Sequence, residues 1–178
     1  ALGAELPRKV RRAKLDIAID LHDQPFYGKS SELRELACRG EARAGTTHFF
    51  RIATAYVILD GVRVTLAVVF VLPELDLPLV LKVLVNRVEK LGLSIGRLWL
   101  DRGFESVEIF DYLRFRDLPA IVGLAMRGKT GGTRALCRGR SSYVTDHTFH
   151  RAGYGSARIQ VVVVRAHQTA NHAHRPPW

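Results

Sequence analysis

Two aspartates are placed where a divalent metal site can form. Asp20 closes the alternating apolar stretch LDIAID, and Asp101 follows the short apolar run from Ile95 to Leu100. If both runs are neighbouring strands of an open α/β sheet, their carboxylates meet at the carboxyl ends of the strands, where such sheets carry their sites. Converging carboxylates repel each other unless they share a cation such as Mg²⁺, which prefers oxygen ligands and activates water in phosphodiester cleavage. The alternative is that each aspartate only ends its strand as a turn former or helix cap.

A second motif competes as a phosphate site. Gly123, Gly128, Lys129 and Thr130 match the pattern G-x-x-x-x-G-K-[ST] of a P-loop, and a short apolar run precedes them. A P-loop requires a helix that begins at the lysine, so that backbone amides hold phosphate. The two residues after Thr130 are both glycine, which opposes a helix there. A P-loop nucleotide-binding protein is therefore the less favoured alternative, and we expect no nucleotide cofactor.

The elements that must position the two aspartates follow from the hydrophobic pattern. Strands are predicted at 15–21, 49–59, 62–72, 95–100 and 120–125, and helices at 77–91 and 106–116. The dipeptide Asp60-Gly61 predicts a tight hairpin between the second and third strands. Strands linked by a helix run parallel by the crossover rule. The order predicts an α/β fold with a mixed sheet, in which a three-stranded antiparallel part is followed by helix-linked parallel strands.

Positive charge is concentrated at the two ends of the chain. The net charge is +10 over 178 residues, yet residues 15–118 carry −2 and residues 119–178 carry +8. Such a surplus attracts polyanions through counterion release and steering, so nucleic acid or an acidic membrane surface is the expected partner. The alternative is a merely solvated basic surface. The residues that we expect to bind DNA are Arg8, Lys9, Arg11, Arg12, Lys29, Arg127, Lys129, Arg134, Arg138 and Arg140.

Two strings in the chain carry a family resemblance, DIAIDLHDQPFYGK and LWLDRGFESVEIFDYL. With the predicted hairpin and helix between them, they resemble the catalytic domain of DDE (Asp-Asp-Glu) insertion-sequence transposases, which has a ribonuclease-H-like fold. A strand that ends in D-x-G-F is the second-aspartate signature of that family. The resemblance implies that Asp20 and Asp101 are catalytic and bind two Mg²⁺ or Mn²⁺ ions. It also implies DNA cleavage and strand transfer, with transposon ends and target DNA as partners, and allows a homodimer in the DNA complex.

The third carboxylate of that family, a Glu on a later helix, has no counterpart, because no Glu follows Glu108. Asp146 is one candidate to replace it, but Asp146 lies in a strand-like segment and is expected to be a surface or turn residue. Glu105 and Glu108 are expected to face solvent on the helix after Asp101. Because residue 1 is Ala and the third carboxylate is missing, we expect a truncated transposase. The alternative is a non-catalytic remnant that binds DNA but does not cut it.

These observations divide the chain into a basic flank (1–14), a ribonuclease-H-like catalytic domain (15–128), a partial β-rich basic insertion (129–166) and an irregular tail (167–178). Within the insertion, strand character resumes at 142–149 and 157–165. No apolar run approaches the roughly 20 residues that a membrane-spanning helix needs. Cys38 and Cys137 lie in no metal or redox pattern, so we expect a cytoplasmic, nucleoid-associated protein.

Overall fold

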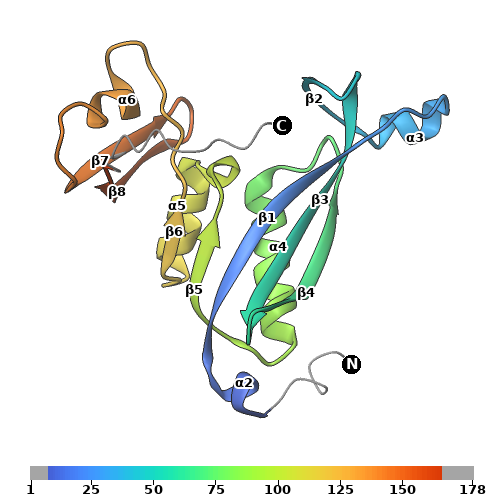
Figure 1. Ribbon diagram of the computed structural model, residues 1–178, viewed down its shortest axis with the longest axis horizontal. Coiled ribbons are helices and arrows are strands. Elements are labelled where there is room, and N and C mark those ends of the chain that lie inside the picture. Colours follow the sequence, from blue (N-terminus) through green and yellow to red (C-terminus); the bar gives the residue numbers. More distant parts are fainter. Residues whose placement is uncertain (1–7, 166–178) are drawn as a thin grey trace, which may run out of the picture.

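The computed structural model describes residues 8–165, and Figure 1 shows the order of their elements. The side chains of Arg8 and Lys9 and the predicted tail 167–178 lie outside the described residues. Within residues 8–165, no helix has the length and apolar character needed to cross a membrane. The elements are α2 (Arg8–Arg12), β1 (Lys14–Pro25), α3 (Ser31–Glu35), β2 (Cys38–Arg43), β3 (Thr46–Leu59), β4 (Val62–Val71), α4 (Leu77–Lys90), β5 (Ser94–Leu100), the 3₁₀ turn η1 (Arg102–Phe104), α5 (Val107–Phe115), β6 (Ala120–Val122), α6 (Gly132–Leu136), β7 (Tyr143–Arg151) and β8 (Gly155–Val163).

One mixed sheet of six strands forms the centre of the molecule. β3 pairs with β1 along one edge and with β2 and β4 along the other, always antiparallel. On the far side of β1, β5 and then β6 join in parallel. The spatial order is therefore β4, β3, β1, β5, β6, with the antiparallel part on one side of β1 and the parallel part on the other. This confirms the predicted mixed α/β sheet and is compatible with a ribonuclease-H-like fold.

Local sequence signals account for the hairpin and for the long helix. Asp60 and Gly61 both take positive φ angles (50° and 80°), so β3 turns into β4 where the dipeptide predicted it. Asp76 caps α4, because its Oδ1 accepts a hydrogen bond of 3.2 Å from the Leu79 amide. Gly92 ends the helix with a φ of 74°. One face of α4 is buried against the sheet and consists of Val80, Leu81, Leu84, Val85 and Val88.

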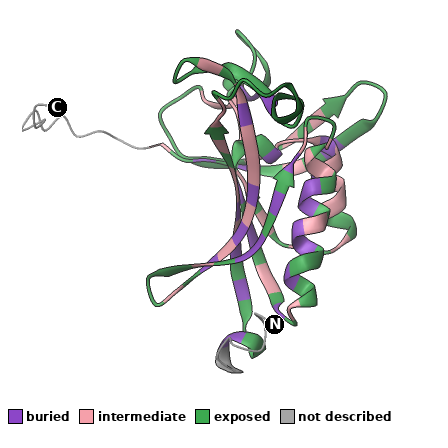
Figure 2. Ribbon diagram, turned by 90° about the vertical axis from the view of Figure 1, so that its right-hand side faces the viewer, coloured by how far each residue is buried: buried purple, intermediate pink, exposed green. Residues whose placement is uncertain are grey.

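The helices α4 and α5 cover one face of the sheet only, and Figure 2 shows α4 standing on that side. On β1, Leu15, Ile17 and Ile19 point into this core and are buried. Alternate residues point to the opposite face, which we call the open face. Within the described residues, the open face carries exposed apolar side chains on three strands, namely Val68, Phe70, Trp99 and Ile121. Side chains on this face are therefore accessible to a partner or ligand.

β7 and β8 form a separate antiparallel hairpin that packs on α5. The rings of Phe149 and Phe110 lie 5.2 Å apart between centroids, and Ala157 of β8 is fully buried beside them. The strand character predicted for 142–149 and 157–165 is thus confirmed with slightly shifted bounds. Val122 and Leu124, at the end of β6 and just after it, pack against the same small cluster.

The structure differs from the sequence pattern in several short elements, α2 and η1 among them, and in several strand ends. β2, α3 and α6 were not predicted, because their residues are mostly exposed and show no apolar period. β1 continues past the predicted end at residue 21 to Pro25, because β3 extends as its partner to Phe49. β6 ends at Val122 and not at residue 125, since its partner β5 ends at Leu100.

Candidate active site

β1 and β5 bring Asp20 and Asp101 next to each other. Ile19 and Leu100 are paired across the parallel ladder; Asp20 is the next residue of β1, and Asp101 is the residue directly after β5. The turn after Asp101 also touches β1, because a Cβ built on Gly103 would lie 3.2 Å from Leu21 Cδ1. The expectation that Asp20 ends its strand is wrong, since β1 runs on to Pro25. The expectation that the two strands are adjacent is confirmed.

The Asp101 carboxylate is held by the turn that follows it. Its Oδ1 accepts a hydrogen bond of 2.8 Å from the Gly103 amide, so Asp101 is the N-cap of η1. A side chain at Gly103 would lie 3.0 Å from that oxygen, and one at Gly123 would lie 3.1 Å from the Arg102 amide nitrogen. Phe104 is fully buried and anchors the turn in the core. The D-R-G-F sequence therefore fixes one carboxylate oxygen and leaves Oδ2 available.

Asp20 lies on the open face with its side chain 36% exposed. Its Oδ2 is 3.3 Å from Nε2 of His22, which lies two residues further along the same face. The residue across from Asp20 on β3 is Thr54, whose hydroxyl accepts a hydrogen bond from Arg63 of β4. Sequence reasoning did not single out Arg63, because no motif surrounds it and only the strand register brings it here.

The carboxylate oxygens of Asp20 and Asp101 are the ligand type that a hard cation such as Mg²⁺ prefers, but two carboxylates are few ligands for one ion. Mg²⁺ is commonly bound by one or two carboxylates together with waters and substrate phosphates. Asp20 and Asp101 offer such a pair of accessible carboxylates from adjacent strand positions. Among residues 8–165, no group of three or more His, Cys, Asp or Glu side chains is arranged to hold a metal ion. Further ligands would have to come from water, substrate or another part of the protein.

The other acidic residues near the second aspartate have structural contacts. The side chain of Glu105 is only 3% exposed, and its Oε2 accepts a hydrogen bond of 2.5 Å from the Ala125 amide. Its Oε1 lies 3.3 Å from Arg127 Nε. Glu108, 13% exposed, is paired with Arg151. The expectation that both glutamates face solvent is wrong, because their side chains are largely buried and paired with Arg127 and Arg151.

Asp146 lies on β7, as its strand-like segment predicted. Its Oδ2 is 2.6 Å from Arg158 Nη2 on the neighbouring strand β8, and its side chain is half-exposed. Asp146 is thus an exposed hairpin residue neutralised by a cross-strand arginine. The described structure does not place it beside Asp20 or Asp101.

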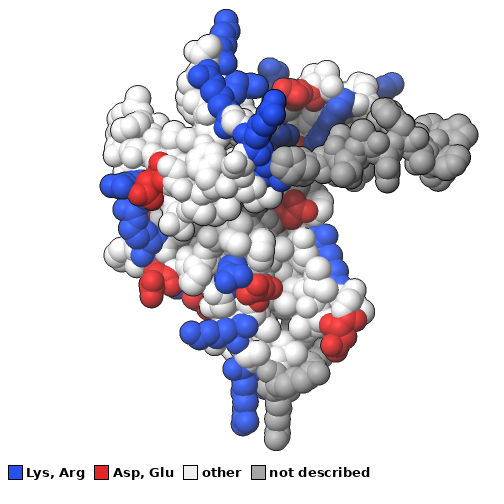
Figure 3. All heavy atoms as spheres, turned by 60° about the vertical axis from the view of Figure 1, so that its left-hand side comes forward, with Lys and Arg blue, Asp and Glu red and all other residues white. Residues whose placement is uncertain are grey.

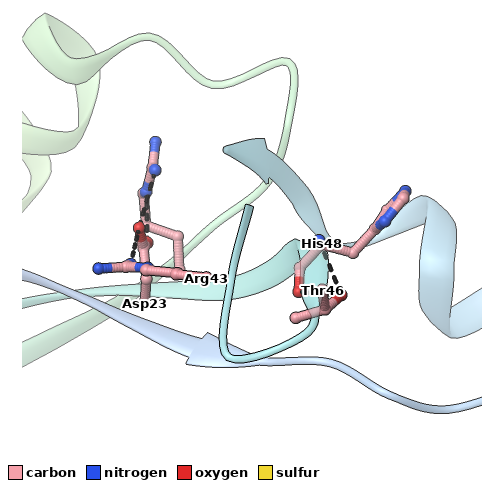
Figure 4. A network of polar contacts seen from close by, with 5 residues as sticks. Asp23, Arg43, Thr46 and His48 are labelled. Atoms are coloured by element: carbon pink, nitrogen blue, oxygen red, sulfur yellow. Dashed lines mark hydrogen bonds and ion pairs between the residues drawn. The ribbon is translucent and has the colours of Figure 1, made fainter. Parts of the chain in front are cut away.

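A polar network follows the site along β1 (Figure 4). Asp23 accepts hydrogen bonds from Arg51 Nε (2.7 Å) and from Arg43 Nη2 (2.6 Å). The hydrogen bonds from Arg51 lower the pKa of Asp23 below its ordinary value and raise the pKa of Arg51. Lys29, predicted to bind DNA, lies beyond this network in the exposed connection to α3. The network fixes the carboxyl end of β1 to β2 and β3.

The predicted basic insertion begins with a compact unit around α6, which we call the basic segment (residues 127–140). Thr133 is buried at its centre, donating from Oγ1 to the Ala125 carbonyl (2.6 Å) and accepting from the Arg127 amide (2.8 Å). Arg134 Nε donates to the Gly128 carbonyl (2.7 Å), and Arg138 Nη2 donates to the Thr130 carbonyl (2.6 Å). These contacts orient the arginines without neutralising them.

Several cations of the basic segment carry uncompensated charge. Within the described part of the chain, no carboxylate lies within 4.0 Å of Lys129, Arg134, Arg138 or Arg140. Arg127 differs, since Glu105 is its partner. Figure 3 shows Lys and Arg side chains gathered at the end of the molecule that carries α6. The basic segment therefore presents a positive surface suited to phosphate groups.

The predicted DNA-binding residues do not form one surface. Arg11 and Arg12 are exposed on α2, which lies at the opposite end of the sheet from α6 (Figure 1). The basic flank and the basic segment are thus separated by the length of the sheet. The structure brings together only the members of the basic segment.

The loop after β6 lacks the geometry of a P-loop. The helix that follows Lys129 begins at Gly132, is five residues long and has Gly131 as its N-cap. At Gly128, a Cβ would lie 2.5 Å from the Gly131 carbonyl oxygen, so the loop is filled by its own backbone. A carbonyl oxygen in that position repels a phosphate, whereas a P-loop offers amides. The loop therefore does not support the nucleotide-binding alternative.

Comparisons with known proteins support the fold. No protein-family model matches the chain, and no curated protein matches it. The solved structure of the piggyBac transposase synaptic complex with hairpin DNA is similar, with a TM-score of 0.51 at 11% sequence identity. The match covers 89% of this chain and 35% of that chain, so this chain spans about a third of that chain's length. The chain therefore shares the fold of the matched part of that structure.

Proposed function

We propose that this chain is the catalytic core of a DDE-type insertion-sequence transposase, which cleaves DNA at transposon ends and joins the freed 3′-hydroxyl to target DNA. The observation that carries the proposal is the adjacency of Asp20 and Asp101 on paired parallel strands. The transposase-like fold supports it. So does the turn after Asp101, in which the Gly103 amide binds one carboxylate oxygen and Phe104 is buried in the core.

In this proposal, the two aspartates hold Mg²⁺ or Mn²⁺ ions through the carboxylate oxygens that the protein leaves open. A bound pair of ions activates the attacking hydroxyl and stabilises the leaving oxygen of a phosphodiester. Asp101 contributes an oxygen whose direction is set by the Gly103 hydrogen bond. Asp20 contributes from the middle of a paired strand, where its backbone has little freedom. The uncompensated cations of the basic segment hold the DNA backbone.

The third carboxylate is the part that this chain does not supply. Glu105 and Glu108 are engaged with Arg127 and Arg151, and Asp146 is paired with Arg158. We therefore propose a fragment of a transposase that lacks the third catalytic carboxylate. A non-catalytic DNA-binding remnant is the second candidate, favoured by the absence of a group of three metal-binding side chains among residues 8–165.

A nicking assay separates these candidates. The purified chain is incubated with supercoiled plasmid and Mn²⁺, beside variants D20N, D101N and D16N. D16N is the matched control, because Asp16 lies on the same strand and face but beside Arg97, away from Asp101. Nicking by the wild type and D16N, lost in D20N and D101N, supports the enzyme. Nicking retained by D20N or D101N contradicts the proposed site.

DNA binding without nicking in the wild type favours the remnant. Its contacts are tested by replacing Arg134 and Arg138 together with Gln and measuring affinity against salt concentration. Each lost phosphate contact reduces the slope of log affinity against log salt by about one. R158Q is the control, since Asp146 already neutralises Arg158. A wild type that binds no DNA contradicts both candidates.

A further inference from the structure

A cation outside the predicted site is fixed on the same open face as Asp20. Arg63 of β4 stacks over the ring of Tyr56, with Cζ 3.7 Å from the ring centroid. Its Nη2 donates to Thr54 Oγ1 at 3.1 Å and lies 3.4 Å from His22 Nε2. Three strands therefore hold this guanidinium in place, although Arg63 is an exposed residue close to a hairpin turn.

The side chain of Arg63 extends along the sheet toward Asp20. The backbone of Arg63 is paired with Ile58, next to the β3–β4 turn. Its guanidinium reaches Thr54, which is the residue directly across from Asp20 on β3. His22 lies between Arg63 and Asp20, with Nε2 3.4 Å from Arg63 Nη2 and 3.3 Å from Asp20 Oδ2. The guanidinium thus ends one side chain away from the first carboxylate of the proposed site.

The charge of Arg63 is not neutralised within residues 8–165. No carboxylate lies within 4.0 Å of it, whereas Arg51 and Arg97 of the same sheet are paired with Asp23 and Asp16. His22 Nε2 can form a hydrogen bond with Asp20 or with Arg63, but not with both at once. When Nε2 carries a hydrogen, it donates to Asp20 and cannot accept from Arg63. Thr54 is then the remaining acceptor. Most N–H donors of the guanidinium stay available.

We propose that Arg63 binds a nonbridging oxygen of the nucleic-acid phosphate that lies at, or next to, the Asp20–Asp101 site. The inference rests on the proposed function. A guanidinium matches phosphate oxygens with two parallel N–H bonds, and stacking on Tyr56 leaves its edge open for them. A cation at this place also offsets the repulsion between a phosphate and the two carboxylates. Tyr56 and Thr54 hold the guanidinium in position before the substrate arrives.

Binding of a fluorescein-labelled DNA duplex, followed by anisotropy in Ca²⁺ over a range of salt concentrations, tests this assignment. The variants are R63Q, R63K and R97Q, the last a matched arginine on the same face that Asp16 already pairs. R63Q is expected to bind about tenfold more weakly, with a salt slope lower by about one. R63K is expected to retain the slope, because it keeps the charge. R97Q is expected to bind within about twofold of the wild type.

The outcomes separate this inference from the proposed function. R63Q binding like the wild type with an unchanged slope overturns the role of Arg63 and leaves the proposed function standing. R97Q losing as much affinity as R63Q also overturns it, since the loss then reflects net charge alone. A wild type that binds no duplex overturns both. Thermal unfolding by circular dichroism checks that each variant is folded. If R63Q is unfolded, R63K decides: a salt slope lower than that of the wild type overturns the inference.

Discussion

Asp20 of β1 and Asp101, the residue directly after β5, each follow the register pair Ile19 and Leu100 of these two parallel strands. Neither carboxylate is compensated by a lysine or arginine within 4.0 Å among the described residues. In the proposed site, a cation or a substrate group would neutralise both carboxylates.

The glycine after Asp101 is expected to be essential for the direction of that carboxylate. In G103A, the new methyl group meets Asp101 Oδ1 at 3.0 Å and Leu21 Cδ1 at 3.2 Å, so the carboxylate must move. We expect a loss of about 1 kcal/mol in stability and weaker binding of Mn²⁺. Calorimetric titration with Mn²⁺ measures the second effect. G131A is the control, because no atom lies within 4 Å of its new methyl group; equal Mn²⁺ affinity in both variants would contradict the role of Gly103.

Asp23 is expected to make the fold acid-sensitive. Hydrogen bonds from Arg51 lower the pKa of Asp23 in the folded protein. A lowered folded pKa stabilises the protein above the unfolded carboxyl pKa of about 3.9, and this contribution is lost as the pH falls through the lower folded value. D23N should therefore reduce the free energy of unfolding at neutral pH by about 2 kcal/mol and flatten its fall in acid.

Urea unfolding at neutral and acid pH checks this prediction. D60N serves as the control, since Asp60 is exposed at the hairpin turn and has no ion-pair partner among the described residues. If the free energy of unfolding falls equally with acid in D23N and in the wild type, the Asp23–Arg51 pair is not the cause of the acid sensitivity.

Thr133 is expected to hold the basic segment in its observed conformation. T133V keeps the shape of the side chain but removes both hydrogen bonds of Oγ1, to the Ala125 carbonyl and from the Arg127 amide. We expect a loss of about 2 kcal/mol and faster amide exchange around α6, with weaker DNA binding as its consequence. T130V is the matched control, because the Thr130 hydroxyl is exposed. Unchanged exchange in T133V would mean that the arginines are oriented by other contacts.

Much of the main sheet could be predicted from the sequence because its signals are local. Asp60-Gly61 fixes the hairpin, Asp76 and Gly92 bound α4, and the helix between β4 and β5 makes β5 parallel to β1. The adjacency of Asp20 and Asp101 follows from that topology. Each of these features depends on residues close in the chain, whose backbone preferences agree with the final fold.

The remaining features depend on contacts between distant segments. Glu105 is buried because Ala125 and Arg127 return to it from beyond β6, which no local pattern indicates. Arg63 reaches the site because β4 and β1 flank the same strand, so that its importance is visible only from the register. β2 has one buried residue and forms only because β3 offers an edge.

The most direct test of the central claim, that Asp20 and Asp101 share a divalent cation, is calorimetric titration of the wild type, D20N, D101N and the double variant with Mn²⁺. Asn at position 101 keeps an oxygen for the Gly103 hydrogen bond, so the turn is preserved while the charge is lost. We predict one binding event that either single substitution weakens by at least about tenfold, with little further loss in the double variant, and that D16N leaves unchanged. Wild-type affinity in D20N and D101N, or losses that add independently in the double variant, would contradict a shared site.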